Sequence, residues 1–422
     1  MHFPLRLCGV ACCLALLLAG NDAIAQDLNE YLEEIRTNNP AYRAAHDQWQ
    51  ATLEKVAVVS TLPDPNVRLG IFAQEVETRV GPQKQRLGVS QTIPWKGKLA
   101  LKGQRAAEMA NKARSELEAV SLKLETEFKN LYAELYYIGR AIAITGDHLK
   151  LLNDLEAVIT ERYETSAAHY NDLIRIQIEI DELSDRLRTQ QESAPPVIAM
   201  MNAILGRPVY QTMTYPESLP KLGNDQLQFQ SLASALPRQN PTLLALDYQI
   251  GADRVTLGLA KKDYYPDFRV GLDWINTGHA INPISESGKD AIMLSVGMNL
   301  PVWRKKYNAA ERSAVSRVST SEQQRDDTRA HLEAGLKRAL FQLDDANRKI
   351  RLYKEQIIPK AEESLSVLTS GFQTGDSTYL DLIEAEKALL DFLLSLSQAQ
   401  ANQSKAISAI EAVTGKSLFA KE

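Results

Sequence analysis

Residues 65–70 read PNVRLG and residues 266–271 read PDFRVG, so one short pattern recurs about 200 residues later in the chain. Other matches surround this pair in the same order, which chance does not explain. The chain is therefore predicted to be two copies of one structural unit, at 26–206 and 227–418, joined by a linker at 207–226. The other matches pair Asn39-Pro40 with Asn240-Pro241, Ile93-Pro94 with Leu300-Pro301, Tyr170–Ile174 with Tyr379–Ile383, and Leu205–Arg207 with Thr414–Lys416.

Two short segments in each copy alternate between apolar and polar residues. Alternation with a period of two predicts β-strands that have one apolar face. A polar, glycine-containing loop separates the two segments, so each pair is predicted to form a hairpin, at about 66–93 and about 267–300. The pattern is clearest in the second copy, where Phe268, Val270, Leu272 and Trp274 alternate with Arg269, Gly271 and Asp273.

Long helices are predicted before and after each hairpin. In the first copy, apolar residues recur every seven positions from Leu117 to Ile159, which is typical of helices packed side by side as in a coiled coil. This predicts a long helix at about 97–162, roughly 100 Å in length. The first copy also has an opening helix at 27–60 and a return helix at 171–204; the second has a long helix at 303–371, with a local kink at Pro359, and a return helix at 378–413.

The first 25 residues are typical of a secretory signal peptide, with Arg6 before an apolar stretch and Ala23-Ile-Ala25 at the expected cleavage site. All three cysteines lie in this segment, so the mature chain is predicted to have neither a disulfide framework nor a thiolate metal site. Lipidation at Cys12 or Cys13 is an alternative, but it would leave a very short apolar core. The net charge of −5 does not indicate a nucleic-acid partner.

Strands of about ten residues with one apolar face have the length expected of an outer-membrane β-barrel. Four strands are too few to close a barrel, and an open sheet edge is not tolerated in lipid, so the chain is expected to form oligomers. A dimer would supply eight strands, which side chains usually fill, whereas a trimer would supply twelve and leave a lumen. Ordinary half-buried strands of a soluble protein remain the alternative at this point.

Three stretches resemble the TolC-like outer-membrane factors of efflux pumps and type I secretion: QTIPWKGK at 91–98, FQTG at 372–375 leading into Tyr379-Leu-Asp381, and YETS at 163–166. The resemblance covers essentially the whole mature chain. It implies a mainly α fold with a small β part: a homotrimer whose twelve-stranded barrel in the outer membrane of a Gram-negative bacterium continues into a periplasmic helical tunnel. The PWKGK stretch is most similar to the heavy-metal cation efflux branch.

The resemblance also implies where the functional residues lie. Asp381 and Glu384 would line the periplasmic mouth of the tunnel, where Asp172 and Arg175 of the first copy could form ion pairs with them. Rings of such acids attract cations. A simpler explanation is that Asp381 and Asp172 favour helix N-termini. The implied tip and adaptor contacts are Tyr163, Ser166, His169, Tyr170, Phe372, Gly375 and Tyr379, and the implied barrel–tunnel junction is Pro94, Trp95, Gly97, Pro301 and Trp303.

The sequence contains no catalytic motif, and the histidines of the mature chain lack metal-ligand spacing, so no enzyme, cofactor or resident metal is expected. The resemblance implies an exit duct that contacts outer-membrane lipid, a periplasmic adaptor (membrane fusion protein) and an inner-membrane pump of the proton-driven resistance-nodulation-division type. Heavy-metal cations are the expected cargo. The alternatives are a duct for drugs or small organic molecules and, from another class, a non-channel periplasmic coiled-coil adaptor.

Overall fold

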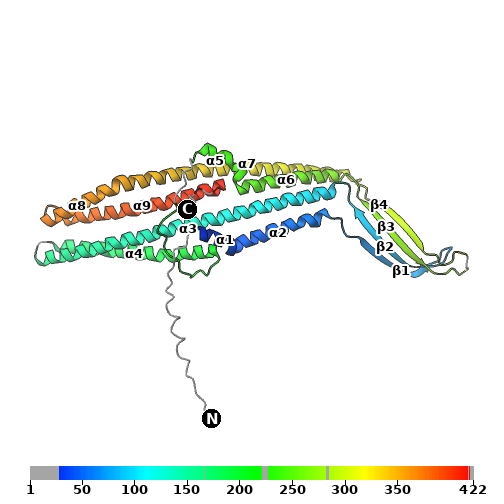
Figure 1. Cartoon of the computed structure of the whole chain (residues 1–422), viewed down its shortest axis with the longest axis horizontal. Coiled ribbons are helices and arrows are strands. Elements are labelled where there is room, and N and C mark those ends of the chain that lie inside the picture. The colour runs from blue at the N-terminus through cyan, green and yellow to red at the C-terminus, as the bar shows by residue number, and fades with distance from the viewer. Residues whose placement is uncertain (1–27, 167, 221–226, 282–284, 417, 419–422) are drawn as a thin grey trace, which may run out of the picture.

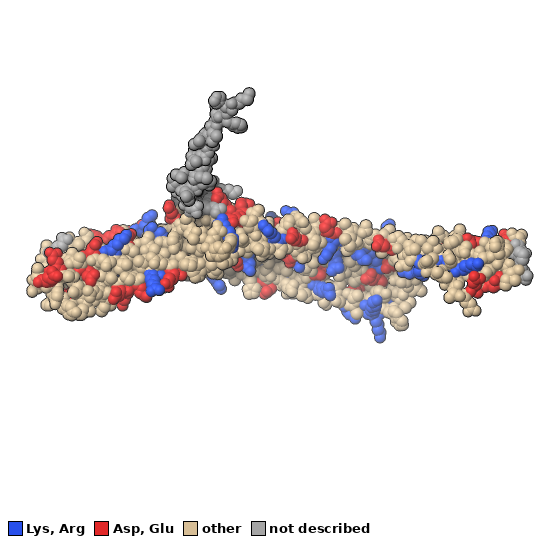
Figure 2. Space-filling model, turned by 90° about the horizontal axis from the view of Figure 1, so that it is seen from below, with Lys and Arg blue, Asp and Glu red and all other residues tan. Residues whose placement is uncertain are grey.

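The computed structural model describes residues 28–166, 168–220, 227–281, 285–416 and 418. The predicted signal peptide and part of the predicted linker lie outside these residues. The chain is mainly helical and elongated, with the helices side by side and one small sheet at the end of the molecule (Figure 1). On the face shown in Figure 2, acidic and basic side chains are scattered along the helices, and much of the strand end is uncharged.

Both repeats have the same order of elements. The first contains α1 (Leu28–Asn38), α2 (Pro40–Ser60), β1 (Asn66–Val76), β2 (Gln83–Ile93), α3 (Lys98–Glu164) and α4 (Tyr170–Leu205). The second contains α5 (Phe229–Gln239), α6 (Pro241–Lys262), β3 (Phe268–Thr277), β4 (Ala291–Met298), α7 (Arg304–Leu352), the π-helix η1 (Tyr353–Ile357), α8 (Ile358–Thr374) and α9 (Tyr379–Thr414).

The four strands form one antiparallel sheet in the order β1-β2-β3-β4, so the pairing of β2 with β3 joins the two repeats. The alternating apolar residues fall on one face, because Leu69 pairs with Leu87, Leu87 with Trp274, and Trp274 with Ile292. This face is not covered by the rest of the chain: Leu69 is 70% exposed. Within the described residues, β1 and β4 each have a strand partner on one side only.

The prediction of one helix over 27–60 was wrong, because the chain breaks between α1 and α2. Asn39 is extended (φ −66°, ψ 125°), and its side-chain oxygen accepts hydrogen bonds from the backbone N–H groups of Ala41 and Tyr42. A residue before proline is pushed out of the helical region, whereas proline suits the first position of a helix. Asn240 makes the same cap ahead of Pro241, so the break is a feature of both repeats.

Two glycines complete this break. Gly206 and Gly415 follow the return helices with φ of 70°, in the left-handed region that suits glycine. A Cβ atom on Gly206 would lie 2.7 Å from the Asn38 carbonyl oxygen, and one on Gly415 would lie 2.5 Å from that of Gln239. The Asn-Pro and glycine matches in the sequence therefore come from one packing arrangement that is built twice.

The long helix of the second repeat departs from α-helical geometry where the sequence predicts a kink. Residues Tyr353–Ile357 form the π-helical turn η1, and Pro359 follows at the start of α8. Proline has no N–H group to donate to the helix, and a π-turn is a common way to accommodate such a defect. No helix in the described part of the chain combines the length and the apolar character needed to cross a membrane.

A buried lysine connects the sheet to the helices. Lys98, at the start of α3, is 6% exposed, and its Nζ atom lies 3.0 Å from Asp267 Oδ1 and 3.2 Å from Asp263 Oδ1. Asp267 also accepts a hydrogen bond of 2.8 Å from the backbone N–H of Trp95. These ion pairs join the first repeat to the second where the strands meet the helices.

We expect Lys98→Met to destabilise the protein by about 1–2 kcal/mol, because it leaves two carboxylates without their cation. Both carboxylates are partly exposed, which keeps the effect below that of a fully buried pair. The melting temperature of the detergent-solubilised protein, followed by circular dichroism, measures the change. Lys96→Met is the matched control, because Lys96 is exposed; equal effects of both substitutions would contradict the assignment.

Candidate functional site

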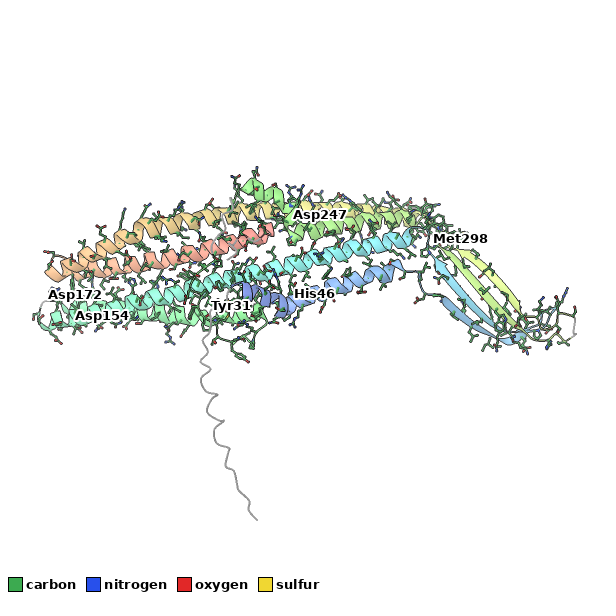
Figure 3. All side chains as sticks on the ribbon, viewed as in Figure 1. Tyr31, His46, Asp154, Asp172, Asp247 and Met298 are labelled. Atoms are coloured by element: carbon green, nitrogen blue, oxygen red, sulfur yellow. The ribbon has the colours of Figure 1, made fainter. Side chains whose placement is uncertain are left out.

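The two interhelical turns lie together at the end of the molecule opposite the sheet. Asp172, near the first turn, is labelled at one end of Figure 3, and Met298, at the end of the last strand, is labelled where the sheet meets the helices. In the first turn, Ser166 has a φ of 60°, and in the second, Gly375 has a φ of 89°. Ser166 is thus held in a backbone conformation that costs a residue with a Cβ atom roughly 1–2 kcal/mol.

An aromatic and cationic contact joins the two tips. The Arg162 guanidinium lies 4.3 Å from the centre of the Phe372 ring and donates a hydrogen bond of 3.1 Å to the Phe372 carbonyl oxygen. Tyr163 and Tyr170 contact each other across the first turn, with ring centres 5.7 Å apart. Phe372 was expected at the tip, but Arg162 was missed; its only signal in the sequence is a basic residue in the last turn of a helix.

Tyr379 is the most buried of the expected tip residues. It is 6% exposed and packs with Ile159, Ile176 and Ile383 in a core that joins α3 and α4 to α9. Its hydroxyl has no hydrogen-bond partner among the described residues. Burial raises the pKa of this hydroxyl well above its usual value, and the negative charges of Glu179 and Asp172 raise it further.

Asp381 forms a capping box at the start of α9. Its Oδ2 atom accepts a hydrogen bond of 3.1 Å from the backbone N–H of Thr378 and one of 2.6 Å from the Thr378 hydroxyl. Thr378 Oγ1 in turn accepts from the backbone N–H of Asp381. These hydrogen bonds hold the pKa of Asp381 below its usual value, because they favour the ionised carboxylate.

The remaining expected mouth residues are less constrained. Asp172 accepts a hydrogen bond of 3.2 Å from the backbone N–H of His169, which makes it the counterpart of Asp381 in the first repeat. Glu384 and Arg175 are exposed, and neither has an ion-pair partner among the described residues. The expected ion pairs between the two tips are therefore not formed within one chain, and Asp172 and Arg175 act instead on the pKa of Tyr379.

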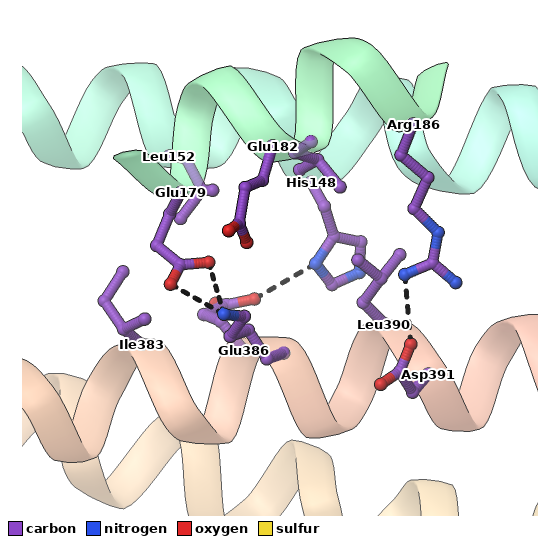
Figure 4. Close-up of a pocket in the computed structure, with 11 residues that line it drawn as sticks. His148, Leu152, Glu179, Glu182, Arg186, Ile383, Glu386, Leu390 and Asp391 are labelled. Atoms are coloured by element: carbon purple, nitrogen blue, oxygen red, sulfur yellow. Dashed lines mark hydrogen bonds and ion pairs between the residues drawn. The ribbon is translucent and has the colours of Figure 1, made fainter. Parts of the chain in front are cut away.

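A polar layer connects the same helices farther from the tip, around a pocket of about 190 Å³ (Figure 4). His148 Nδ1 on α3 lies 3.2 Å from Glu386 Oε2 on α9, and both side chains are largely buried. Two further contacts link α4 to α9: Lys387 Nζ lies 2.6 Å from Glu179 Oε1, and Arg186 Nη1 lies 3.2 Å from Asp391 Oδ1. The sequence did not indicate this layer, because its members are far apart in the chain and fit no motif.

The expected barrel–tunnel junction is asymmetric. Trp95 stacks on Tyr265 with ring centres 5.0 Å apart, and Gly97 precedes α3 with a φ of 88°. Trp303, the counterpart of Trp95 in the second repeat, is 78% exposed, so the rest of the described chain leaves most of its surface uncovered. Pro94 and Pro301, which precede these tryptophans, are both half-buried. Within the described residues, His, Cys, Asp and Glu side chains form no group of three that could hold a metal ion.

Comparison with known proteins identifies the fold. The family model "Outer membrane efflux protein" matches residues 232–416. The chain is similar to VceC, the outer membrane protein of Vibrio cholerae, with 18% identity, a TM-score of 0.76, and coverage of 93% of this chain and 96% of that one. It is also similar to CusC, a transmembrane channel, with 13% identity, a TM-score of 0.76, and coverage of 93% and 92%.

A curated relative is similar over a shorter stretch. The cobalt-zinc-cadmium resistance protein CzcC of Cupriavidus metallidurans is 22% identical over 150 residues. That stretch is 36% of this chain and spans about a third (34%) of the length of the relative.

We expect the contact of His148 with Glu386 to hold α9 against α3, because both side chains are largely buried. His148→Leu should leave the Glu386 carboxylate buried without this partner, which destabilises the layer by about 1–3 kcal/mol. Hydrogen–deuterium exchange in residues 383–391 should therefore be faster than in the wild type at the same pH.

His331→Leu is the matched control, since His331 is exposed on α7, and it should leave this exchange unchanged. Equal exchange rates in His148→Leu and the wild type would contradict the role given to this pair.

Proposed function

We propose that the chain is a TolC-like outer-membrane factor and the passive exit duct of a tripartite efflux system, because the family model matches its second half and its fold is similar to that of VceC over 93% of its length. The duct is a homotrimer that carries solutes from the periplasmic side to the outside. It acts with a periplasmic adaptor and an inner-membrane pump of the proton-driven resistance-nodulation-division type. The chain carries no enzymatic activity, so the energy comes from the pump.

The observation that carries this proposal is the uncovered apolar face of the sheet. Exposed leucine, isoleucine and valine side chains cover one face of all four strands, where a soluble protein would expose polar groups. Lipid is the solvent that this face fits. The two unpaired edge strands require neighbours in lipid, and three copies supply the twelve strands that leave an open lumen.

The acidic tip supports a mouth at the far end of the duct. Asp381 and Glu384 are exposed at the start of α9, and three copies would bring six carboxylates together. Such rings attract cations and repel anions. Tyr163, Ser166, His169 and Tyr170 form the neighbouring first-repeat tip, which is the surface we assign to the adaptor.

We propose heavy-metal cations as the cargo. The similarity to a cobalt-zinc-cadmium resistance protein supports this class, together with the PWKGK stretch at 94–98 and the acidic mouth. Disruption of the chromosomal copy should therefore raise the sensitivity of the host to cobalt, zinc or cadmium salts, measured as minimal inhibitory concentrations. Raised sensitivity to organic drugs alone would replace this cargo with the small-organic alternative.

Single-channel recording in planar bilayers tests the duct and its mouth together. The wild-type protein is expected to give small, cation-selective steps, and Asp381→Ala/Glu384→Ala should lose part of this selectivity because the acidic rings are removed. Glu362→Ala/Glu363→Ala removes the same number of exposed acids from α8 and should leave the selectivity unchanged.

Two outcomes would contradict the proposal at different levels. Conducting steps that do not respond to Asp381→Ala/Glu384→Ala would remove these residues from the mouth and keep the duct. Well-folded protein that neither enters the outer-membrane fraction nor conducts would favour the non-channel adaptor.

A further inference from the structure

The polar face of the sheet carries an excess of positive charge. Side chains alternate between the two faces of a strand, and directly paired residues share a face. Arg68 pairs with Gly88 and Gly88 with Asp273, so these three lie in one row across the polar face. Arg86 lies two residues from Gly88 on β2, and Arg269 lies four residues from Asp273 on β3, so both lie on this face as well.

One aspartate opposes these three arginines. Arg86 Nε lies 3.0 Å from Asp273 Oδ1, so these two side chains form an ion pair. Arg68 and Arg269 are exposed and have no ion-pair partner among the described residues. The net charge of these four groups is therefore +2 per chain.

Small residues surround the arginines on the same face. Asp273 lies directly over Gly88, where a Cβ atom would come within 2.2 Å of its carboxylate. Gly271 and Ser295 form the next row, and Gly297 pairs with Arg269. Arg68 and Arg269 are thus each paired directly with a glycine, which leaves room around their long side chains. The opposite face of the same strands is mostly apolar, with Leu69, Leu87, Trp274 and Ile292 in one row.

We infer that Arg68, Arg86 and Arg269 form a basic band on the lumen wall of the barrel, and that this end of the duct favours negatively charged solutes. The inference rests on the proposed duct, because only a closed barrel makes the polar face a lumen. Three copies bring six uncompensated positive charges to the wall, three from Arg68 and three from Arg269, which lies four residues farther along the strands. Rings of fixed charge select ions of the opposite sign in such pores. The duct then has an acidic mouth and a basic exit, so the two ends favour opposite ions.

The reversal potential in a KCl gradient tests the band once the acidic mouth has been removed. In the Asp381→Ala/Glu384→Ala protein, we expect Arg68→Gln/Arg269→Gln to shift the K⁺/Cl⁻ permeability ratio toward K⁺ by about two-fold or more. The mean salt concentration should be kept near about 0.1 M, because screening lengths shorten at higher salt. Asp273→Asn removes the only acid of the band and should shift the ratio toward Cl⁻.

Arg68→Lys/Arg269→Lys in the same background keeps both charges and should retain the Cl⁻ preference that the glutamine variant loses. Equal permeability ratios for the glutamine and lysine variants would overturn the basic band, even though the protein conducts. A wild-type protein that never conducts would overturn the duct itself, so the two failures are distinguishable. If the glutamine variant fails to form channels, the direction of the Asp273→Asn shift decides the inference.

Discussion

In lipid, every backbone N–H and C=O group needs a hydrogen-bond partner, and the rest of the structure depends on this constraint. A four-stranded sheet meets this need in its interior and leaves it unmet along β1 and β4. The apolar face adds a second requirement, because Leu69 and its neighbours are exposed and have no core to enter. Both requirements point outside the single chain: in the proposed duct, lipid covers the face and further copies pair with the edges.

The duplication of the unit follows from the same geometry. Each repeat supplies one hairpin to the sheet and one set of long helices below it. The Asn-Pro break and the glycine after the return helix occur in both repeats with the same contacts. Charged contacts between the repeats then fix their relative position: Lys98 with Asp267 near the sheet, and buried Lys129 with Glu411, 2.6 Å apart, near the middle of the helices.

The features that the sequence predicted are those that depend on local periodicity. The alternation around Arg269 and the heptads from Leu117 to Ile159 are local signals, and the strands and long helices lie at these positions. The break before Pro40 also has a local signal, the Asn39-Pro40 pair, but the strong helical pattern on both sides led to the prediction of one continuous helix. The contact of His148 with Glu386 was beyond reach, because it depends on how α3 packs against α9. Arg162 was missed for the same reason, since Phe372 lies on the other helical hairpin.

The capping role of Asp381 and its proposed role in the mouth do not exclude each other. The Thr-x-x-Asp pattern at 378–381 is a helix-start signature, and the structure shows the capping box that it predicts. Hydrogen bonds from Thr378 lower the pKa of the carboxylate, so Asp381 keeps its negative charge to a more acidic pH than a free aspartate. The cap also fixes the position of that charge at the start of α9. Glu384, one turn farther along and without a partner in the described chain, adds a charge that is free to respond to a cation or to a neighbouring copy. In the proposed mouth, Asp381 therefore supplies a negative charge of fixed position, and Glu384 supplies one whose side chain is not held by a partner in the described chain.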